Sequence, residues 1–479
     1  MNRTKVTKIT KITVARITSI LAPFIFISAF LVYAFIHHQR HSQFLTFGWD
    51  LAVFDQPIYL LSRGLAPFSS LHNMNTLGDH FHPLLLIAGT ILYRIWADPR
   101  MLLWLETFVA VASAAVIFTL AKKVLRQPIL ALALSIMYLF SVGFQAMVLD
   151  DFHDDVLVTL PLTLLFLFLH QKNWLGYWLA TTAMLLVKEE FGLLAAAIGL
   201  FIILKKISFK HGLITIVVGL TTFFLLLEVI MPQFNRGSGY AYKYRHYSEA
   251  NQPQILINQF INQPATLVTT FFDHPLKRQT LLTAVTSFGF LPLLAPPVFA
   301  LPILETLFIR FIDPTTFLRF AFNNHYNGPL LPLLAVAGVY GTSRLLRRFS
   351  PGFLTAWVIG FALLQNFLFH GPINSLFKPQ FYRLTDWQQD AHELIRQVPD
   401  TGSLATQNFL LPHLSQRASY FLLPEVKDAD YIAAVLNHTA PDFYGPPVDQ
   451  LQPQLEALID TNQYRVIWQT NQALLLKRN

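Results

Sequence analysis

The sequence predicts an all-α polytopic membrane protein with a small α/β domain at its C-terminal end. Of 479 residues, 53% are hydrophobic and only 13% are charged, and the mean hydropathy is +0.44. A soluble domain carries about 25% charged residues. Many apolar runs approach the roughly 20 residues that cross a bilayer. Beyond Lys378 the composition changes to short apolar stretches separated by polar ones, which indicates a separate water-exposed domain.

The charge and the cysteine count exclude several classes of protein. The formal net charge is +8, but Lys and Arg stand in short runs between apolar segments, without the interleaved aromatic residues of a nucleic-acid surface. The chain has no cysteine, which excludes disulfides, cysteine-ligated zinc and thiol catalysis. The N-terminal apolar run is long and lacks a small-residue cleavage site, so we expect a retained first span.

The basic residues predict the orientation in the membrane. Lys122-Lys123, Lys205-Lys206 and Arg347-Arg348 lie in short loops that contain no Asp or Glu, and further basic residues precede the first span. The positive-inside rule places these loops and the N-terminus in the cytoplasm. We therefore expect a multi-pass protein of the cytoplasmic membrane whose C-terminal domain is extracytoplasmic.

With this orientation the chain crosses the membrane about eleven times. The apolar segment Leu84–Trp96 is short, and a crossing there would reverse the side of every later loop, so we expect it to be re-entrant or interfacial. A long external loop is expected over Pro232–Gln279. The predicted spans are Ile17–Ile36, Leu102–Ala121, Pro128–Leu149, Val156–Leu169, Trp174–Val187, Phe191–Leu204, Leu213–Met231, a hairpin within Leu281–Ile312, Leu330–Leu346 and Phe353–Phe369.

Five polar groups interrupt the apolar pattern, and all of them fall on the predicted non-cytoplasmic face. Ionisable residues at a membrane boundary are costly to bury and are candidates for function. Had they been distributed over both faces, a transport path would be the better interpretation. The candidate site residues are Asp50, Asp55, His80, His82, Asp150, Asp151, His153, Asp154, Lys188, Glu189, His325 and Tyr326.

The first two groups follow the first span. Asp50 is a candidate general base for an acceptor hydroxyl, and the alternative is a helix cap or a solvated loop residue. Asp55 lies five residues further on and would point in another direction on a helix. In an extended backbone His80 and His82 point to one side, where they could share a divalent metal, bind a phosphate or only hydrogen-bond at the interface.

The later groups combine acids with one amine. If the segment is helical, Asp151, Asp154 and Asp155 share a face, and their mutual repulsion calls for a cation, a hydrogen-bonding substrate or solvent. Lys188 beside Glu189 is either a partly buried ion pair or a point charge that binds a phosphate. The alternative for His325-Tyr326 is an ordinary pair at the membrane interface.

The segment 377–479 is predicted to be the α/β domain, and residues 1–376 the transmembrane domain. Thr385-x-x-Gln388 is a capping-box pattern before an amphipathic helix that extends through Val398. No phosphate-binding glycine loop is present, which favours a binding or scaffolding role. Strands are expected at Ser403–Thr406, Tyr420–Leu423, Tyr431–Val435, Arg465–Gln469 and Ala473–Leu476, and a second helix at Gln450–Ile459.

Ordered motifs along nearly the whole chain resemble a family of bacterial and archaeal polytopic membrane proteins that is classed as a domain of unknown function. That family is similar in layout to the GT-C glycosyltransferases. The motifs are Asp50 through Gln56, Gly78-Asp79-His80-Phe81-His82-Pro83, Phe152-His153-Asp154, Lys188-Glu189, His325-Tyr326 and Pro412-His413-Leu414-Ser415-x-Arg417.

The resemblance implies a glycosyltransferase that uses a polyprenyl-phosphate sugar as donor and a cell-envelope acceptor at the outer face of the membrane. Asp50 then occupies the place of the catalytic acid or base, and Asp150–Asp155 the place of a second functional acid. His80 and His82 depart from the Glu and Lys that many members of the superfamily place before a proline. This departure leaves the donor-phosphate contacts and the need for a divalent metal open.

Two other functions remain alternatives at this point. A lipid or polysaccharide transporter would carry ionisable residues deep in several spans, and Glu106 and Glu228 are the main isolated acids in apolar runs. A non-catalytic assembly protein would use its C-terminal domain to bind a partner.

Overall fold

The computed structural model describes residues 3–235, 261–312, 317–442 and 444–479. Part of the predicted external loop, residues 236–260, lies outside these ranges. The chain divides into two compact units. The first comprises residues 1–33, 106–233 and 237–374, and the second comprises residues 34–105, 234–236 and 375–479.

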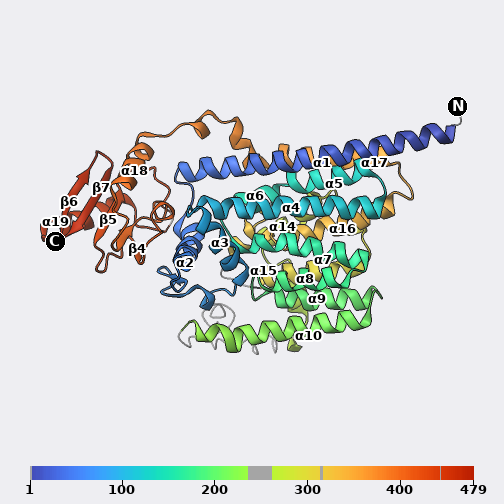
Figure 1. Cartoon of the computed structure of the whole chain (residues 1–479), viewed down its shortest axis with the longest axis horizontal. Coiled ribbons are helices and arrows are strands. Elements are labelled where there is room, and N and C mark those ends of the chain that lie inside the picture. Colours follow the sequence, from blue (N-terminus) through green and yellow to red (C-terminus); the bar gives the residue numbers. More distant parts are fainter. Residues whose placement is uncertain (1–2, 236–260, 313–316, 443) are drawn as a thin grey trace. The chain divides into compact units, whose positions relative to one another are not determined.

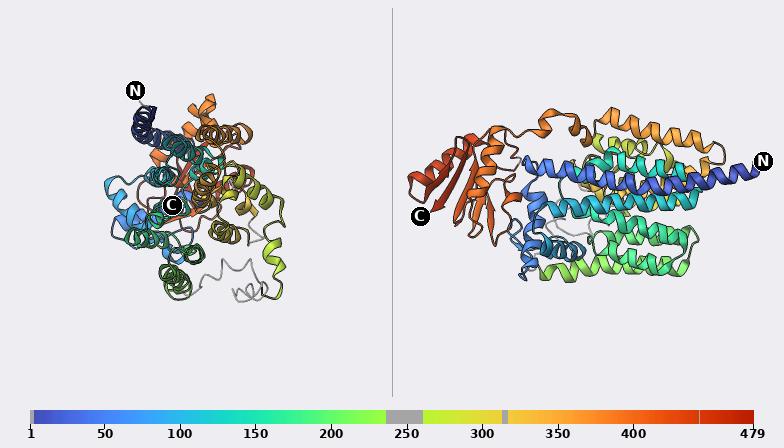
Figure 2. Two further views of the ribbon diagram at one scale, coloured as in Figure 1. Left: turned by 90° about the vertical axis from the view of Figure 1, so that its right-hand side faces the viewer. Right: turned by 45° about the horizontal axis from the view of Figure 1, so that its top comes forward.

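The first unit is a bundle of helices, and a helix lies in every predicted span. Figures 1 and 2 show many of these helices running alongside one another. The unit contains the N-terminal part of α1 (Arg3–Ser42), most of α4 (Arg100–Leu125), and α5 (Pro128–Phe140), α6 (Val142–Leu149), α7 (Thr159–Gln171), α8 (Trp174–Leu185), α9 (Phe191–Leu204), α10 (Phe209–Leu225), α13 (Ala265–Thr269), α14 (Pro275–Thr286), α15 (Ala300–Phe311), α16 (Leu330–Leu345) and α17 (Pro351–Phe369).

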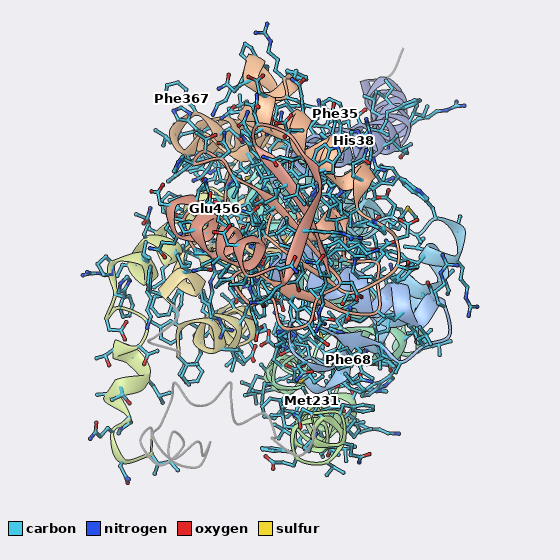
Figure 3. All side chains as sticks on the ribbon, turned by 90° about the vertical axis from the view of Figure 1, so that its left-hand side faces the viewer. Phe35, His38, Phe68, Met231, Phe367 and Glu456 are labelled. Carbon is cyan, nitrogen blue, oxygen red and sulfur yellow. The ribbon has the colours of Figure 1, made fainter. Side chains whose placement is uncertain are left out.

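Length and apolar character identify the membrane-crossing helices. Among the described residues five helical segments are long and apolar enough to cross a membrane, and α5 with α6 makes a sixth if this pair, bent by 49°, is one span. Apolar side chains project from these helices, and Phe367 of α17 is 75% exposed (Figure 3). An aqueous protein rarely exposes such a surface, whereas lipid covers it. The five are Arg16–Ser42, Arg100–Leu125, Asp154–Gln171, Phe209–Gln233 and Pro351–Phe369.

Glycines bring α9 and α10 into close contact. A Cβ atom at Gly192 would lie 2.6 Å from the Gly219 carbonyl oxygen, and one at Gly199 would lie 2.6 Å from the Gly212 carbonyl oxygen. Each helix carries its two glycines seven residues apart, so they lie on one face. Because lipid gives little hydrophobic drive for helix association, this close approach of two backbones supplies the packing energy.

The second unit combines short membrane-associated helices with the predicted α/β domain. α2 (Val53–Ser62) and α3 (Pro83–Ile95) pack together, and β1 (Phe68–Ser69) and β2 (Met74–Asn75) form a small hairpin between them. α3 is shorter than a span, in keeping with the expected re-entrant or interfacial segment. The C-terminal elements are α18 (Asp386–Gln397), α19 (Val448–Asp460), β3 (Leu404–Thr406), β4 (Tyr420–Leu422), β5 (Tyr431–Val435), β6 (Tyr464–Gln469) and β7 (Ala473–Arg478).

The five C-terminal strands form one mixed sheet in the order β4-β3-β5-β7-β6. β3 pairs in parallel with β4 and β5, whereas β7 is antiparallel to both β5 and β6. All five predicted strands and both helices are therefore confirmed. The capping box is also present, because Thr385 and Gln388 satisfy each other's backbone N–H at the start of α18.

A residue from the start of the chain completes the core of this sheet. Phe44, which follows α1, is fully buried and packs with Trp387 of α18 and with Phe409. Gln388 donates a 3.0 Å hydrogen bond to the Gln43 carbonyl oxygen. The loop after the first span is thus part of the folded α/β domain.

Candidate functional site

The acidic group of the first unit occupies a turn between two helices. The chain leaves α6 at Asp150 and reverses at Asp151, which has a φ of 78° and accepts a hydrogen bond from the Phe152 N–H. Asp tolerates this left-handed conformation because its short side chain bonds to the nearby backbone. A 3-10 turn, Asp154–Val158, then leads into α7. The acids therefore do not lie on one regular helix, and each faces a different neighbour.

Asp150 and His325 form the first contact of this group. One Asp150 oxygen accepts hydrogen bonds of 2.9 Å from both the backbone N–H and Nδ1 of His325. Although burial acts to raise it, the bonds from His325 lower the pKa of Asp150. Burial, followed by the neighbouring His153, lowers the pKa of His325 to about 4. At neutral pH the pair is therefore a carboxylate beside a neutral imidazole.

His153 stacks on His325 and extends the pair to a set of three. Their ring centroids are 3.3 Å apart and the rings are within 7° of parallel. One ligand atom each from Asp150, His153 and His325 lie within 4.8 Å of one another. Carboxylate oxygens and neutral imidazole nitrogens are ligands of borderline divalent metals such as Zn²⁺. Among the described residues, this is the set of three whose geometry could hold such an ion.

Lys188 lies between α8 and α9 and pairs with the same acidic turn. Its Nζ is 3.0 Å from Asp155 and 3.6 Å from Asp154, and all three side chains are at most 7% exposed. The sequence suggested Glu189 as the ion-pair partner of Lys188, but the two aspartates form the ion pair instead. Glu189 is buried nearby. A buried ammonium between two carboxylates leaves one net negative charge in the group.

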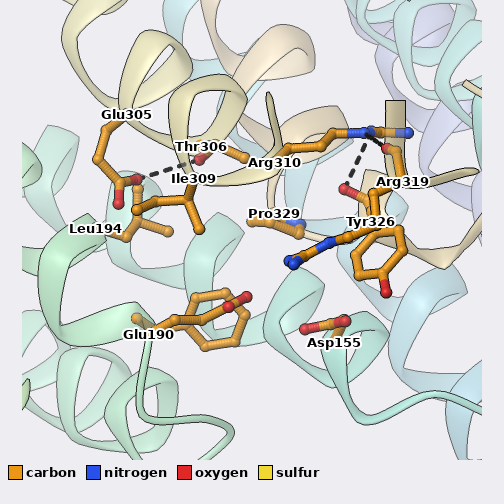
Figure 4. A pocket seen from close by; sticks show the side chains of 11 residues that line it. Asp155, Glu190, Leu194, Glu305, Thr306, Ile309, Arg310, Arg319, Tyr326 and Pro329 are labelled. Carbon is orange, nitrogen blue, oxygen red and sulfur yellow. Dashed lines mark hydrogen bonds between the residues drawn. The ribbon is translucent and has the colours of Figure 1, made fainter. Parts of the chain in front are cut away.

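A cavity opens next to this ion pair. Its empty volume is about 400 Å³, including some space open to solvent. Figure 4 shows Arg319 extending toward the middle of the cavity, with Asp155 and Tyr326 on one side and Glu190 and Glu305 on the other. The cavity thus offers acids, a guanidinium and a phenol within the first unit.

Arg310 holds one wall of the cavity in shape. It donates to the backbone oxygens of Arg319 and Ala321 and, at 2.7 Å, to the side chain of Asn327. The Arg319 guanidinium lies 4.8 Å from the ring centroid of Tyr326, a cation–π contact. Arg310 is therefore occupied by the loop it supports, whereas Arg319 faces the cavity.

Glu190 belongs to the polar group recognised at Lys188, but three residues of this site were not predicted from the sequence, namely Glu305, Arg310 and Arg319. Each interrupts or borders an apolar run, and an ionisable residue in such a run is a candidate for function by itself. That signal could have found them. Their convergence on one cavity could not be read from the sequence, because it depends on how α9 and α15 pack.

Glu106 is a further buried acid of the first unit. It lies in α4, is 0% exposed, and has Asp151, Asp150 and the His153 backbone N–H as electrostatic neighbours. Within the described ranges neither of its oxygens has a hydrogen-bond partner of normal geometry. Glu228, the other isolated acid, is exposed.

In the second unit, Asp50 lies in a π-helical turn, Gly48–Ala52, that leads into α2. Such turns are rare and are frequent at functional sites. Its side chain is partly exposed. Asn408 fixes the start of the turn, because its carbonyl oxygen and its side-chain oxygen accept from the backbone N–H groups of Gly48 and Trp49.

His80 and His82 have different surroundings. His82 is buried and hydrogen-bonds to Thr76 at 3.1 Å. His80 lies 4.0 Å from Asp79, which is also 3.6 Å from His72. In the described ranges these two predicted residues are not part of a group of three metal-capable side chains.

Asp55 is enclosed by hydrogen-bond donors. It is 0% exposed and accepts from Tyr93 at 2.5 Å, from Ser415 at 2.5 Å and from Gln416 at 3.1 Å. Burial, opposed by these bonds, raises the pKa of Asp55 to about 6. Both oxygens of the Asp55 carboxyl therefore have hydrogen-bond partners within the protein, and neither is exposed to solvent.

The bundle of apolar helices defines the chain as an integral multi-pass membrane protein. More particularly, residues 40–474 match the family described as "predicted membrane protein (DUF2079)", and the chain belongs to this family.

A solved structure has a similar fold. The crystal structure of ArnT from Cupriavidus metallidurans bound to undecaprenyl phosphate superposes with a TM-score of 0.57, at 10% sequence identity, over 95% of this chain and 97% of that one. At this identity the likeness establishes the fold, which is ArnT-like. No curated protein matches the chain.

Proposed function

We propose that the protein is a glycosyltransferase that transfers a sugar from a polyprenyl-phosphate donor to a cell-envelope acceptor. The observation that carries the proposal is the cavity at Asp155, Arg319 and Tyr326, in a fold similar to that of a protein bound to undecaprenyl phosphate. A lipid-linked donor stays in the bilayer while its phosphate and sugar need a polar cavity at the membrane boundary.

The chemistry requires a base and a site for the leaving phosphate. In the proposed inverting reaction the acceptor oxygen forms a bond to the anomeric carbon, and the bond from that carbon to the phosphate oxygen breaks. The electron pair leaves with the lipid phosphate, and the acceptor proton passes to the Asp50 carboxylate. A positioned base of this kind contributes about 10²- to 10⁴-fold in rate.

Arg319 is the proposed ligand of the leaving phosphate in the first unit. A guanidinium presents a planar set of donors that matches phosphate geometry, and this one faces the cavity. Lys188 contributes at longer range, because Asp154 and Asp155 already occupy its ammonium. His80, which is partly exposed, is the proposed donor toward the substrate at the membrane boundary, whereas His82 is buried and bonded to Thr76.

The ligand set of Asp150, His153 and His325 fits a divalent metal, since it offers one carboxylate and two imidazoles within 4.8 Å. A bound cation would add positive charge where the phosphate leaves. Without it, Asp150 orients the His325 ring through a 2.9 Å hydrogen bond from Nδ1 and accepts a second bond of 2.9 Å from the His325 backbone N–H.

The proposed location is the outer face of the cytoplasmic membrane, with the N-terminus inside and the α/β domain outside. The support is the distribution of basic residues, which fall in the loops predicted to be cytoplasmic. A lipid-linked sugar presented on that face would be used without a soluble nucleotide sugar.

The test is transfer by the purified protein from a panel of polyprenyl-phosphate sugars to a cell-envelope fraction, followed by mass spectrometry of the products. Asp50→Ala should lower the rate about 10²-fold or more. Asp449→Asn is the matched control, since this acid is 82% exposed on α19. Full activity in Asp50→Ala would refute the assignment of the base.

A lipid transporter is the second candidate, and Glu106 is the observation that favours it. A fully buried carboxyl in a membrane span is a typical element of a proton or ion path. Lipid flux across liposomes that persists in Asp50→Asn and is lost in Glu106→Gln would support transport and contradict the transferase.

A further inference from the structure

We infer that the C-terminal α/β domain is a positioning element for Asp50, and that Ser415 and Asn408 fix the loop that carries this residue. The role given to Asp50 rests on the proposed function, whereas the contacts do not. All residues involved belong to the second unit.

The first contact holds the π-helical turn from its N-terminal end. Gly48 donates to the Asn408 carbonyl oxygen at 2.8 Å, and Trp49 donates to the Asn408 side chain at 3.2 Å. A Cβ atom at Gly48 would lie 2.8 Å from both Asn408 and Leu411. A larger residue here would displace the ends of these two side chains, two residues before Asp50.

The second contact holds the turn from its C-terminal end. Ser415 donates to Asp55 at 2.5 Å, and the neighbouring Gln416 donates to the same carboxylate at 3.1 Å. Tyr93 of α3 completes the carboxylate's partners. Because Asp55 is fully buried, this is a point at which α2, α3 and the domain are joined without intervening solvent.

Gln56 repeats the connection one residue later. Its side-chain amide donates to the Arg417 carbonyl oxygen at 3.0 Å and to Ser70 at 2.8 Å, while its oxygen accepts from the Ser70 N–H at 2.8 Å. Tyr420 of β4 packs with Ala52 and Leu411 in a buried cluster beneath the turn. Asp50 is thus a partly exposed residue in a segment fixed on both sides by the domain.

This arrangement explains two sequence motifs together. Asp50 through Gln56 and Pro412 through Arg417 are more than 350 residues apart, yet their side chains bond directly. A general base needs its oxygen held within a fraction of an ångström of the reactive position. The domain supplies that constraint, which gives it a role in the reaction although it contributes no reacting group.

The first experiment is hydrogen exchange of the full-length protein in nanodiscs, read at peptides covering residues 43–56. Ser415→Ala should speed exchange there about tenfold, because it removes a buried hydrogen bond to a carboxylate. Ser415→Thr, which keeps a hydroxyl, should restore the slow rate. Asp430→Asn is the matched control, because Asp430 also bonds to a serine, Ser403, but at an exposed position just before strands β3 and β5 of the same sheet.

Unchanged exchange in both Ser415→Ala and Asp55→Asn would overturn the inference. The second experiment uses the transfer assay, where Ser415→Ala should lower kcat about tenfold and change KM for the donor less than about twofold. Faster exchange with unchanged kcat would also overturn the positioning role. If the wild-type protein shows no transfer, the proposed function fails, whereas the exchange result still decides whether the domain fixes the loop.

Discussion

The two units both bury carboxylates, but they do so in different ways. In the first unit Asp155 is 2% exposed and lies 3.0 Å from an ammonium, beside a cavity. In the second unit Asp55 is 0% exposed and is surrounded by two hydroxyls and an amide. The first arrangement keeps charge next to open space, and the second closes a carboxyl inside the protein.

This difference is the one we expect between an acid at a substrate-binding cavity and an acid at a structural connection. Removing a carboxylate from water costs several kcal/mol, and the two units offset that cost with different partners. Asp155 pairs with the Lys188 ammonium at 3.0 Å beside the cavity. Burial raises the pKa of Asp55, and the neutral donors around it offset only part of this rise. We therefore propose that the first acid lies at a site of substrate binding and that the second acid has a positioning role.

The largest expected effect tests the charged arrangement. Lys188→Ala should destabilise the protein by roughly 3–5 kcal/mol, because it leaves Asp154 and Asp155 buried without their cation. Thermal unfolding in detergent measures this change. Lys427→Ala is the control, since its pair with Glu425 is half exposed and should contribute less than about 1 kcal/mol. Equal unfolding temperatures for the two variants would contradict the buried ion pair.

A smaller effect, with a sign set by pH, tests the neutral arrangement. The pKa of Asp55 is about 6 in the folded protein, above its ordinary value. Its contribution to stability is therefore fully present below about pH 4 and is lost as the pH rises through 6. Because the pKa is higher by about two units, the free energy of unfolding falls by on the order of 3 kcal/mol over this pH range.

Asp55→Asn should remove this pH dependence, since the amide does not titrate. The measurement is unfolding temperature between pH 4 and 8, compared with the wild type under the same conditions. The prediction would be wrong if the wild-type unfolding temperature rose between pH 4 and 6 while that of the variant stayed constant. That result would mean that the folded protein favours the ionised form of Asp55.

The sequence was sufficient to predict the helices and strands, but it was insufficient to predict which residues contact one another in the fold. Strands such as Tyr431–Val435 and the capping box at Thr385 follow from local patterns, and both are confirmed. Apolar runs likewise predicted the positions of the helices. The relation between Asp55 and Ser415 could not be predicted, because it joins residues 360 positions apart, and no local signal encodes such a distance.

The candidate site shows the same limit. The acidic turn and Lys188 were recognised because charged residues stand out in apolar sequence. The pairing of Lys188 with Asp155 instead of its sequence neighbour Glu189 depends on packing between helices. Arg319 was missed because one arginine near an apolar run is common at interfaces, and only the fold turns it toward a cavity.

The smallest expected effect comes from an acid that is exposed to water. Asp430 accepts bonds from the Ser403 N–H and hydroxyl at 2.8 and 2.9 Å, which lower the pKa of Asp430. A lowered pKa gives stability that is present above about pH 4 and is lost as the pH falls, opposite in sign to Asp55. Because water screens this exposed site, Asp430→Asn should change the unfolding free energy by less than about 0.5 kcal/mol at pH 7. A change as large as that of Asp55→Asn would mean that burial does not decide how the two acids act, and the comparison between the two arrangements would then fail.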